Sequence, residues 1–266
     1  MIITANSVAA NKLGFQEKDQ LLFHEAVNGR MSIWSTVIFP IAFKYGMASI
    51  KAFRHGAVYV DQQVKSEGCD SIAATLASLS IKEQQAQSQG VHFFLNYDFR
   101  LEKLGAYIQQ LEMESLGKPF TIQQKPVSRY PGQCIIALDG FQAAHSVMQY
   151  VHQSPQMISL TYAICKDEHA NYNEASCHLN SNYEVLSAGF SDPHQGCHSL
   201  IFGNKPTRKI ELDKLSFSSL GTLLAIYEYK TIIEAFHYEI NPFDQFGVER
   251  PKQIMKKLLE KDHENS

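Results

Sequence analysis

Residues 240–252 read Ile240-Asn-Pro-Phe-Asp-Gln-Phe-Gly-Val-Glu-Arg-Pro-Lys252, and the rest of the chain can be organised around this stretch. Apolar side chains over residues 220–240 predict a long helix that runs into it. A second, lysine-rich helix is expected to follow it, over residues 253–261. Pro242 and Gly247 are turn formers that bracket a loop leading to a helix start. The stretch is therefore expected to be a connection between two helices.

Four polar side chains in this connection could bind a polyhydroxylated ligand: Asp244, Gln245, Glu249 and Lys252. Their amide and ammonium groups can donate hydrogen bonds to hydroxyl groups, and their carboxylate and amide oxygens can accept hydrogen bonds from them. Glu249 precedes Lys252 by three residues, so the two side chains should share a helix face. The alternative for Lys252 is a solvated lysine on the helix surface.

The composition is that of an ordinary globular protein. The 266 residues are 44% hydrophobic and 19% charged, enough for one large or two small domains. A net charge of −3 gives no reason to expect nucleic acid or an anionic membrane as a partner. No apolar run reaches the roughly 20 residues of a membrane span, and no secretion signal is recognisable. We expect a cytoplasmic protein.

The cysteines indicate free thiols and no metal site. There are five, an odd number, and no two are spaced as Cys-x-x-Cys. This usage favours a reducing compartment. Cys177-His178 and Cys197-His198 match no standard zinc spacing. Neither a metal nor another cofactor is expected.

Strands and helices alternate along the chain, which predicts an α/β fold: a three-layer αβα sandwich with a mostly parallel sheet. After short strands at 1–4 and 20–23, core strands are expected at 91–96, 132–138, 157–165 and 209–212. Helices are expected at 7–13, 48–64, 71–86, 101–116, 143–153 and 174–190. Residues 33–45 are apolar nearly all round and predict a buried helix, in which Pro40 should cause a kink or leave a carbonyl group unpaired.

A second candidate site lies at Gly29-Arg-Met-Ser-Ile-Trp-Ser35. Gly29 permits a tight turn, and Ser32 can cap a following helix. Arg30 would then lie at a loop-to-helix junction, where a guanidinium and backbone N–H groups can face an anion. The alternative is a surface arginine.

These stretches carry a resemblance to a known family. Residues 240–252, with the preceding Leu220-Gly-Thr-Leu-Leu-Ala-Ile-Tyr-Glu-Tyr-Lys-Thr-Ile-Ile233, closely resemble the C-terminal signature of glucose-6-phosphate isomerases. The stretch around Arg30 resembles the second signature of that family, although Asn28 replaces one glycine of its pair. Tyr97-Asp98 and Met113-Glu-Ser-Leu-Gly-Lys118 are also similar, as scaffold residues more than catalytic ones.

The resemblance implies a domain organisation and an activity. Residues 26–266 correspond to the second, C-terminal sugar isomerase (SIS) domain, and residues 1–25 to the end of the first. The N-terminal SIS domain, with the loop that holds the substrate phosphate, is expected to be missing. The implied reaction interconverts glucose 6-phosphate and fructose 6-phosphate without a cofactor, because one base can move the proton through a cis-enediol.

The resemblance also implies residue roles. Lys252 and His178 would assist ring opening, and Arg30 would stabilise the enediolate. Gln245 would contact the sugar, with Glu249 as a further substrate-binding residue. The usual Leu-Gly before the lysine is Arg250-Pro251 here.

The general base and the ring-opening histidine are less directly matched. An ungapped comparison places Leu138 at the base, and one deletion places Asp139 there. Leucine cannot carry a proton, whereas aspartate can but is one methylene shorter. The alternative for Asp139 is a helix cap. Ser176 falls near the histidine position, with His178 two residues further on, and an ordinary helix histidine is the alternative.

Three hypotheses remain open at this point. The chain is an active or formerly active isomerase, a non-catalytic remnant that binds sugar phosphate or is purely structural, or one half of a split enzyme. Uncovered apolar surface predicts a homodimer or a partner chain that supplies the missing domain.

Overall fold

The computed structural model describes residues 1–27, 29–86, 90–129, 131–167 and 172–264, so that Asn28 lies outside the described residues. Its centre is a sheet of four parallel strands in the order β4-β3-β5-β6. The strands are β3 (Val91–Asn96), β4 (Cys134–Asp139), β5 (Ile158–Cys165) and β6 (Thr207–Leu212). The predicted parallel sheet is confirmed.

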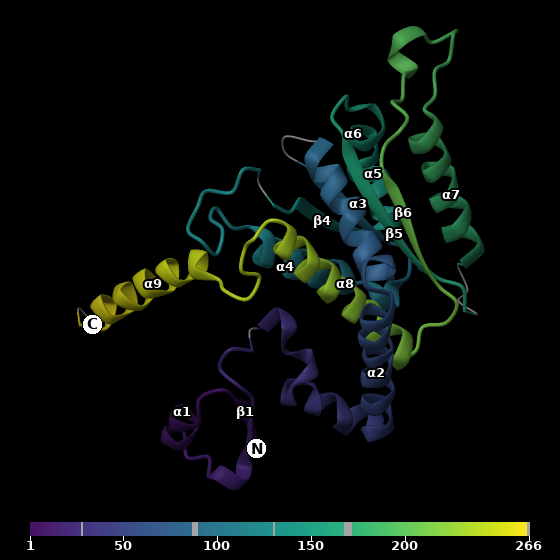
Figure 1. Ribbon diagram of the computed structural model, residues 1–266. Helices are drawn as coiled ribbons and strands as arrows, with labels where there is room; N and C mark the ends of the chain where they lie inside the picture. Colours follow the sequence, from purple (N-terminus) through teal and green to yellow (C-terminus); the bar gives the residue numbers. More distant parts are fainter. Residues whose placement is uncertain (28, 87–89, 130, 168–171, 265–266) are drawn as a thin grey trace.

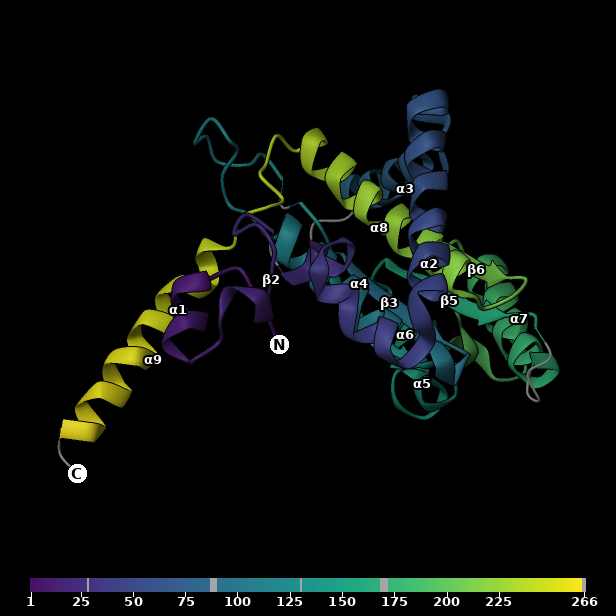
Figure 2. The ribbon, with the colours of Figure 1, turned by 90° about the horizontal axis from the view of Figure 1, so that it is seen from below.

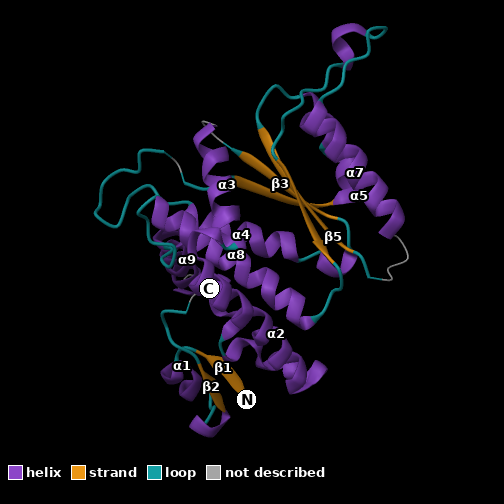
Figure 3. Cartoon of the chain, turned by 45° about the vertical axis from the view of Figure 1, so that its right-hand side comes forward, coloured by secondary structure: helices purple, strands orange, loops and turns teal. Residues whose placement is uncertain are grey.

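Helices cover both faces of this sheet (Figures 1 and 3). On one face, Phe93 and Leu95 of β3 share a core with α5 (Gly140–Ser146), α6 (Met148–Gln153) and α7 (Tyr172–Ala188). On the other face, Phe94 packs with α4 (Leu104–Leu116) and α8 (Phe217–His237). Successive side chains of a strand point to opposite faces, so β3 contributes to both cores. The three-layer αβα sandwich is confirmed.

Two further helices pack over α8: α2 (Phe39–Glu67) and α3 (Ile72–Ala86). The α2–α8 crossing is close because glycines meet there. A Cβ on Gly56 would lie 2.0 Å from the carbonyl oxygen of Ser218, and one on Gly221 would lie 2.0 Å from that of Phe53. Thr222 adds a hydrogen bond from its Oγ1 to the Gly56 carbonyl oxygen at 3.1 Å.

The helix expected over residues 33–45 is confirmed for residues 39–45, but it is wrong for residues 33–38 and in its burial. The chain instead forms short 3₁₀ turns, Gly29–Trp34 and Thr36–Ile38, and α2 begins only at Phe39. Ser35 caps the second turn by accepting a hydrogen bond from the Val37 N–H at 3.3 Å.

The expected kink at Pro40 is wrong for the same reason. Pro40 lies in the first turn of α2, where its missing N–H would be unpaired in any case. The backbone departs from helical geometry at Gly46 instead, where φ is +79°. Around this point Phe43 is 72% exposed, so the start of α2 is not buried on all sides.

Both ends of the chain lie outside the sandwich. Near the N-terminus, β1 (Ile2–Thr4) and β2 (Gln20–Leu22) form a separate two-stranded parallel sheet with α1 (Ser7–Lys12) (Figure 3). Near the C-terminus, α9 (Phe246–Glu264) projects away from the sandwich (Figures 1 and 2). A domain boundary near residue 25 remains a prediction. No helix in the described part of the chain is both long and apolar enough to cross a membrane.

Candidate functional site

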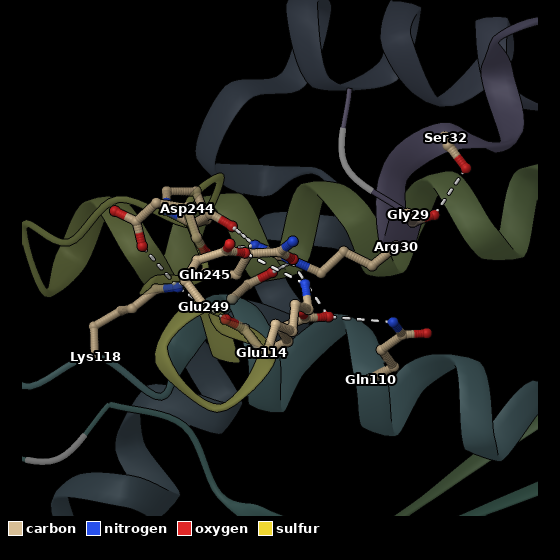
Figure 4. Close-up of polar contacts among 12 residues, drawn as sticks. Gly29, Arg30, Ser32, Gln110, Glu114, Lys118, Asp244, Gln245 and Glu249 are labelled. Atoms are coloured by element: carbon tan, nitrogen blue, oxygen red, sulfur yellow. Dashed lines mark hydrogen bonds and ion pairs between the residues drawn. The ribbon is translucent and has the colours of Figure 1, made fainter. Parts of the chain in front are cut away.

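A dense group of hydrogen-bonded polar side chains surrounds Arg30 (Figure 4). Its side chain runs from the first 3₁₀ turn towards the end of α4 and the loop after α8, and the residue is only 2% exposed. Nε donates to Ser115 Oγ at 2.7 Å, and Nη1 donates to Gln245 Oε1 at 3.1 Å. Nη2 donates to the carbonyl oxygens of Pro242 at 2.5 Å and Asp244 at 3.0 Å.

An ion pair completes these contacts, because Nη1 of Arg30 lies 3.4 Å from Glu114 Oε2. All five N–H groups of the guanidinium therefore have a protein partner. Burial lowers the pKa of Arg30, and the negative charges of Glu114 and Asp244 partly offset this. Arg30 remains a cation, because the pKa of arginine is so high that the side chain stays charged even after its pKa is lowered considerably.

Lys118 joins the same group from the C-terminal end of α4. Its Nζ lies 3.0 Å from Asp244 Oδ1 and donates to the carbonyl oxygens of Asp244 and Glu114 at 2.5 and 2.9 Å. The motif at residues 113–118 is expected from the sequence to be scaffold, whereas its Lys118 lies within the Arg30 group. The polar pattern Glu-Ser-x-Gly-Lys at a helix end was the available signal.

A hollow of about 710 Å³ adjoins the Arg30 group. Its walls come from the end of α4, the loop after it and the first residues of α9; Lys118, Asp244 and Gln245 lie on its polar side. Apolar side chains, among them Phe120 and Phe246, form much of the remainder. The hollow is large enough for a drug-sized or sugar-sized molecule.

Lys252 and Glu249 lie on α9, outside these contacts. Lys252 Nζ is 3.3 Å from Glu249 Oε1, as the three-residue spacing predicts. The Lys252 side chain is 58% exposed. Neither residue is hydrogen-bonded to Arg30 or Gln245 within the described part of the chain.

Asp139 and His178 belong to a second group, at the carboxyl ends of the strands. Asp139 ends β4, and its Oδ1 accepts a hydrogen bond from the Gln142 N–H at 2.9 Å, which makes it the N-cap of α5. His178 Nδ1 lies 2.8 Å from the Tyr97 hydroxyl. Burial and, to a lesser degree, the charge of Asp139 raise the pKa of Tyr97. Leu138 packs into the core beside this group.

The two groups lie at opposite edges of the sheet. The end of α4 adjoins the amino end of β4, because a Cβ built on Gly132 would lie 2.9 Å from the Cβ of Leu116. Asp139 stands at the carboxyl end of the same strand. The five residue-to-residue steps of β4, at about 3.3 Å each, separate the two edges by roughly 17 Å. The chain thus brings Arg30 and Gln245 together, places Asp139 near Tyr97 and His178, and leaves Lys252 on a projecting helix.

Among the residues that the structure describes, no three histidine, cysteine or acidic side chains are arranged to hold a metal ion. The Arg30–Gln245 contact joins both sequence signatures, and it consists of organic donors and acceptors only. Its chemistry suits hydroxyl groups and anions.

Comparisons with known proteins agree on one family. The model of the family described as phosphoglucose isomerase matches residues 1–266. A glucose-6-phosphate isomerase from Sphingopyxis alaskensis is 32% identical over 269 residues, which are 97% of this chain and 52% of the relative. A glucose-6-phosphate isomerase from Shewanella frigidimarina is 30% identical over 287 residues, which are 98% of this chain and 53% of the relative. A crystal structure of the Chlamydia trachomatis enzyme has a TM-score of 0.86 at 22% identity, over 94% of this chain and 51% of that one. The chain spans about half the length of the curated relatives it matches.

Proposed function

Because the chain belongs to the phosphoglucose isomerase family, we propose that it takes part in the isomerisation of glucose 6-phosphate to fructose 6-phosphate. The observation that carries the proposal is the contact between Arg30 and Gln245, which joins two motifs 215 positions apart in the sequence. Gln245, the hydrogen-bond partner of Arg30, lines the hollow together with Lys118, and a cation beside an amide is suited to a polyhydroxylated, negatively charged ligand.

Arg30 would stabilise the charge that develops on the enediolate oxygen. Its donors are all engaged by protein groups, so its contribution would come through its field, or by exchanging Gln245 for the substrate. A buried cation acts more strongly in such surroundings than in water. Gln245 and Glu249 would hold sugar hydroxyls.

Asp139 would carry the proton between the two sugar carbons, and Lys252 with His178 would assist ring opening. A carboxylate that also caps a helix is held in one orientation, as a general base requires. Since these residues do not share one edge of the sheet with Arg30, a second chain or domain would be needed to complete the site. The half-length match to the relatives supports this.

The partner would be a homodimer mate or a chain that supplies the phosphate-binding domain, in the cytoplasm. Helix α9 offers exposed apolar side chains to such a partner, including Ile254, Met255, Leu258 and Leu259. The remaining candidate function is a non-catalytic remnant that binds sugar phosphate. The saturated guanidinium of Arg30 and the exposed position of Lys252 favour this alternative.

A coupled assay with fructose 6-phosphate tests the proposal. The chain is measured alone and after mixing with the amino-terminal half of the Sphingopyxis alaskensis relative. We expect turnover in the mixture, abolished by Lys252→Ala and preserved in Lys256→Ala, a matched change on the same helix. No turnover in either sample, with sugar phosphate still bound, would favour the non-catalytic remnant.

A further inference from the structure

The contact between Tyr97 and His178 at the carboxyl edge is held from several sides. The Tyr97 hydroxyl lies 2.8 Å from Nδ1 of His178, and its ring packs against the rings of Phe141 and Tyr162. Gly140 leaves room for this ring, because a Cβ at that position would lie 2.4 Å from Tyr97 Cε2. The tyrosine is only 6% exposed, so its hydroxyl has little freedom to turn elsewhere.

Asn182, one turn further along α7, faces the same Nδ1 atom of His178. Its Nδ2 donates to the carbonyl oxygen of His178 at 2.8 Å and lies 3.4 Å from His178 Nδ1. The hydrogen bond to the His178 carbonyl oxygen orients the Asn182 amide so that its NH₂ group faces the histidine. A proton on Nδ1 would face this NH₂ group, so Nδ1 is the acceptor and the neutral imidazole carries its proton on Nε2.

Tyr97 is suited to donate to this acceptor. Burial raises its pKa and the negative charge of Asp139 adds to the effect, so the hydroxyl keeps its proton. His178 is half-buried, and no hydrogen bond to its Nε2 is found among the described residues. The Nε2–H group is therefore available for a ligand.

We propose that Tyr97 is a positioning residue that, together with Asn182, holds His178 as the Nε2–H tautomer and so presents one oriented hydrogen-bond donor at the carboxyl edge of the sheet. Tyr97 acts through His178 and does not itself touch the ligand. An oxygen of a sugar ring or hydroxyl is the acceptor that this donor suits, and this choice of acceptor rests on the proposed function.

The test is a measurement of the His178 tautomer by nitrogen-15 NMR on the full chain, labelled at histidine. The spectrum is recorded at about pH 8.5, two units above the ordinary imidazole pKa. Loss of one signal in His178→Gln assigns the resonance. We expect the Nε2–H form to dominate, and its excess over the Nδ1–H form to fall about fivefold in Tyr97→Phe, the effect of one lost hydrogen bond.

Tyr162→Phe is the matched control. Tyr162 is as deeply buried, packs against Tyr97, and its hydroxyl has no hydrogen-bond partner among the described residues. The control should leave the tautomer ratio unchanged. An unchanged ratio in Tyr97→Phe, or an equal change in both variants, would overturn the proposal.

Asn182→Ala provides a second measurement that does not alter the tyrosine. It should also reduce the excess of the Nε2–H form, and no change there would contradict the shared role of the two residues. These readouts do not require turnover. A chain without isomerase activity but with the dominant Nε2–H form would count against the proposed function alone.

Discussion

Arg30 shows how one side chain can join distant parts of a chain. Its guanidinium contacts the end of α4 through Ser115 and Glu114, and the loop after α8 through Gln245 and two carbonyl oxygens. A buried cation needs such complete pairing, because burying an unpaired charge is costly. The pairing is therefore a stability element as well as a candidate site.

Removing this cation should be strongly destabilising. We expect Arg30→Met to lower the free energy of unfolding by about 3–5 kcal/mol, because the half-buried Glu114 and the carbonyl oxygens of Pro242 and Asp244 would lose their cationic partner. Urea denaturation measures the loss. Arg54→Met is the control, since Arg54 is exposed on α2, and it should change the stability by less than about 0.5 kcal/mol. Equal effects of the two changes would contradict this account.

Asp139 has a structural role that can be separated from a catalytic one. Asp139→Ala removes the cap of α5 and should cost about 1 kcal/mol, whereas Asp139→Asn keeps a capping oxygen and should cost little. Thermal unfolding compares the two variants. If turnover is measurable, both should lose it, because neither side chain can accept a proton. Full turnover in Asp139→Asn would exclude Asp139 as the base.

At the scale of elements, the α2–α8 crossing depends on two glycines. We expect Gly56→Ala or Gly221→Ala to destabilise the protein by about 3 kcal/mol or more, because each added methyl group would meet backbone atoms that cannot move aside. Gly247→Ala on α9 is the matched control. A Cβ there meets nothing within 4 Å, so it should be neutral or stabilise the helix by up to about 1 kcal/mol. Differential scanning calorimetry would show whether the crossing tolerates the methyl group.

Glu228 links α8 to α4 and to the turn that carries Arg30. Its carboxylate accepts hydrogen bonds from Trp34 Nε1 at 2.5 Å and from the Tyr107 hydroxyl at 2.9 Å. Burial raises the pKa of Glu228 to about 7, although both hydrogen bonds act to lower it. Folding therefore favours the protonated carboxyl group.

This raised pKa predicts a pH dependence of stability. The contribution of Glu228 is fully present below its unfolded pKa of 4.5 and is lost as the pH rises through about 7. The difference amounts to about 3 kcal/mol. Glu228→Gln should remove it, so the stability difference between wild type and variant should change across this window. A constant difference from pH 4.5 to 8 in denaturant titrations would contradict the expected shift.

At the scale of the whole molecule, the projecting helix α9 leaves apolar surface uncovered. Ile254, Met255, Leu258 and Leu259 are all exposed, and their spacing places them along one side of the helix. A stripe of this kind is typical of an interaction surface.

We therefore expect the chain to associate. Sedimentation at micromolar concentration should show species heavier than the 30.0 kDa monomer. Replacing Met255 and Leu258 by lysine should shift the equilibrium to the monomer, whereas Lys256→Ala on the same helix should not. A monodisperse wild-type monomer would count against association.

Much of the fold could be predicted from local sequence. The strand expected at residues 91–96 was found at the same residues, because a short apolar run bounded by polar residues is typical of a buried strand. The start of α2 was not predicted, because an apolar composition over residues 33–45 does not distinguish a helix from two short turns. Ser35 caps the short turn that precedes this boundary, and Gly46 interrupts the helical geometry inside α2.

The sequence alone determined the alternation of strands and helices, the shared helix face of Glu249 and Lys252, and the resemblance that pointed to the family. These features depend on residues near one another in the chain or on long matching motifs. The tertiary structure alone decided that Arg30 is buried against Gln245 and Ser115, and that Asp139 and His178 lie at the other edge of the sheet. Helical and strand periods specify which residues of one element share a face, whereas packing between elements determines which faces meet.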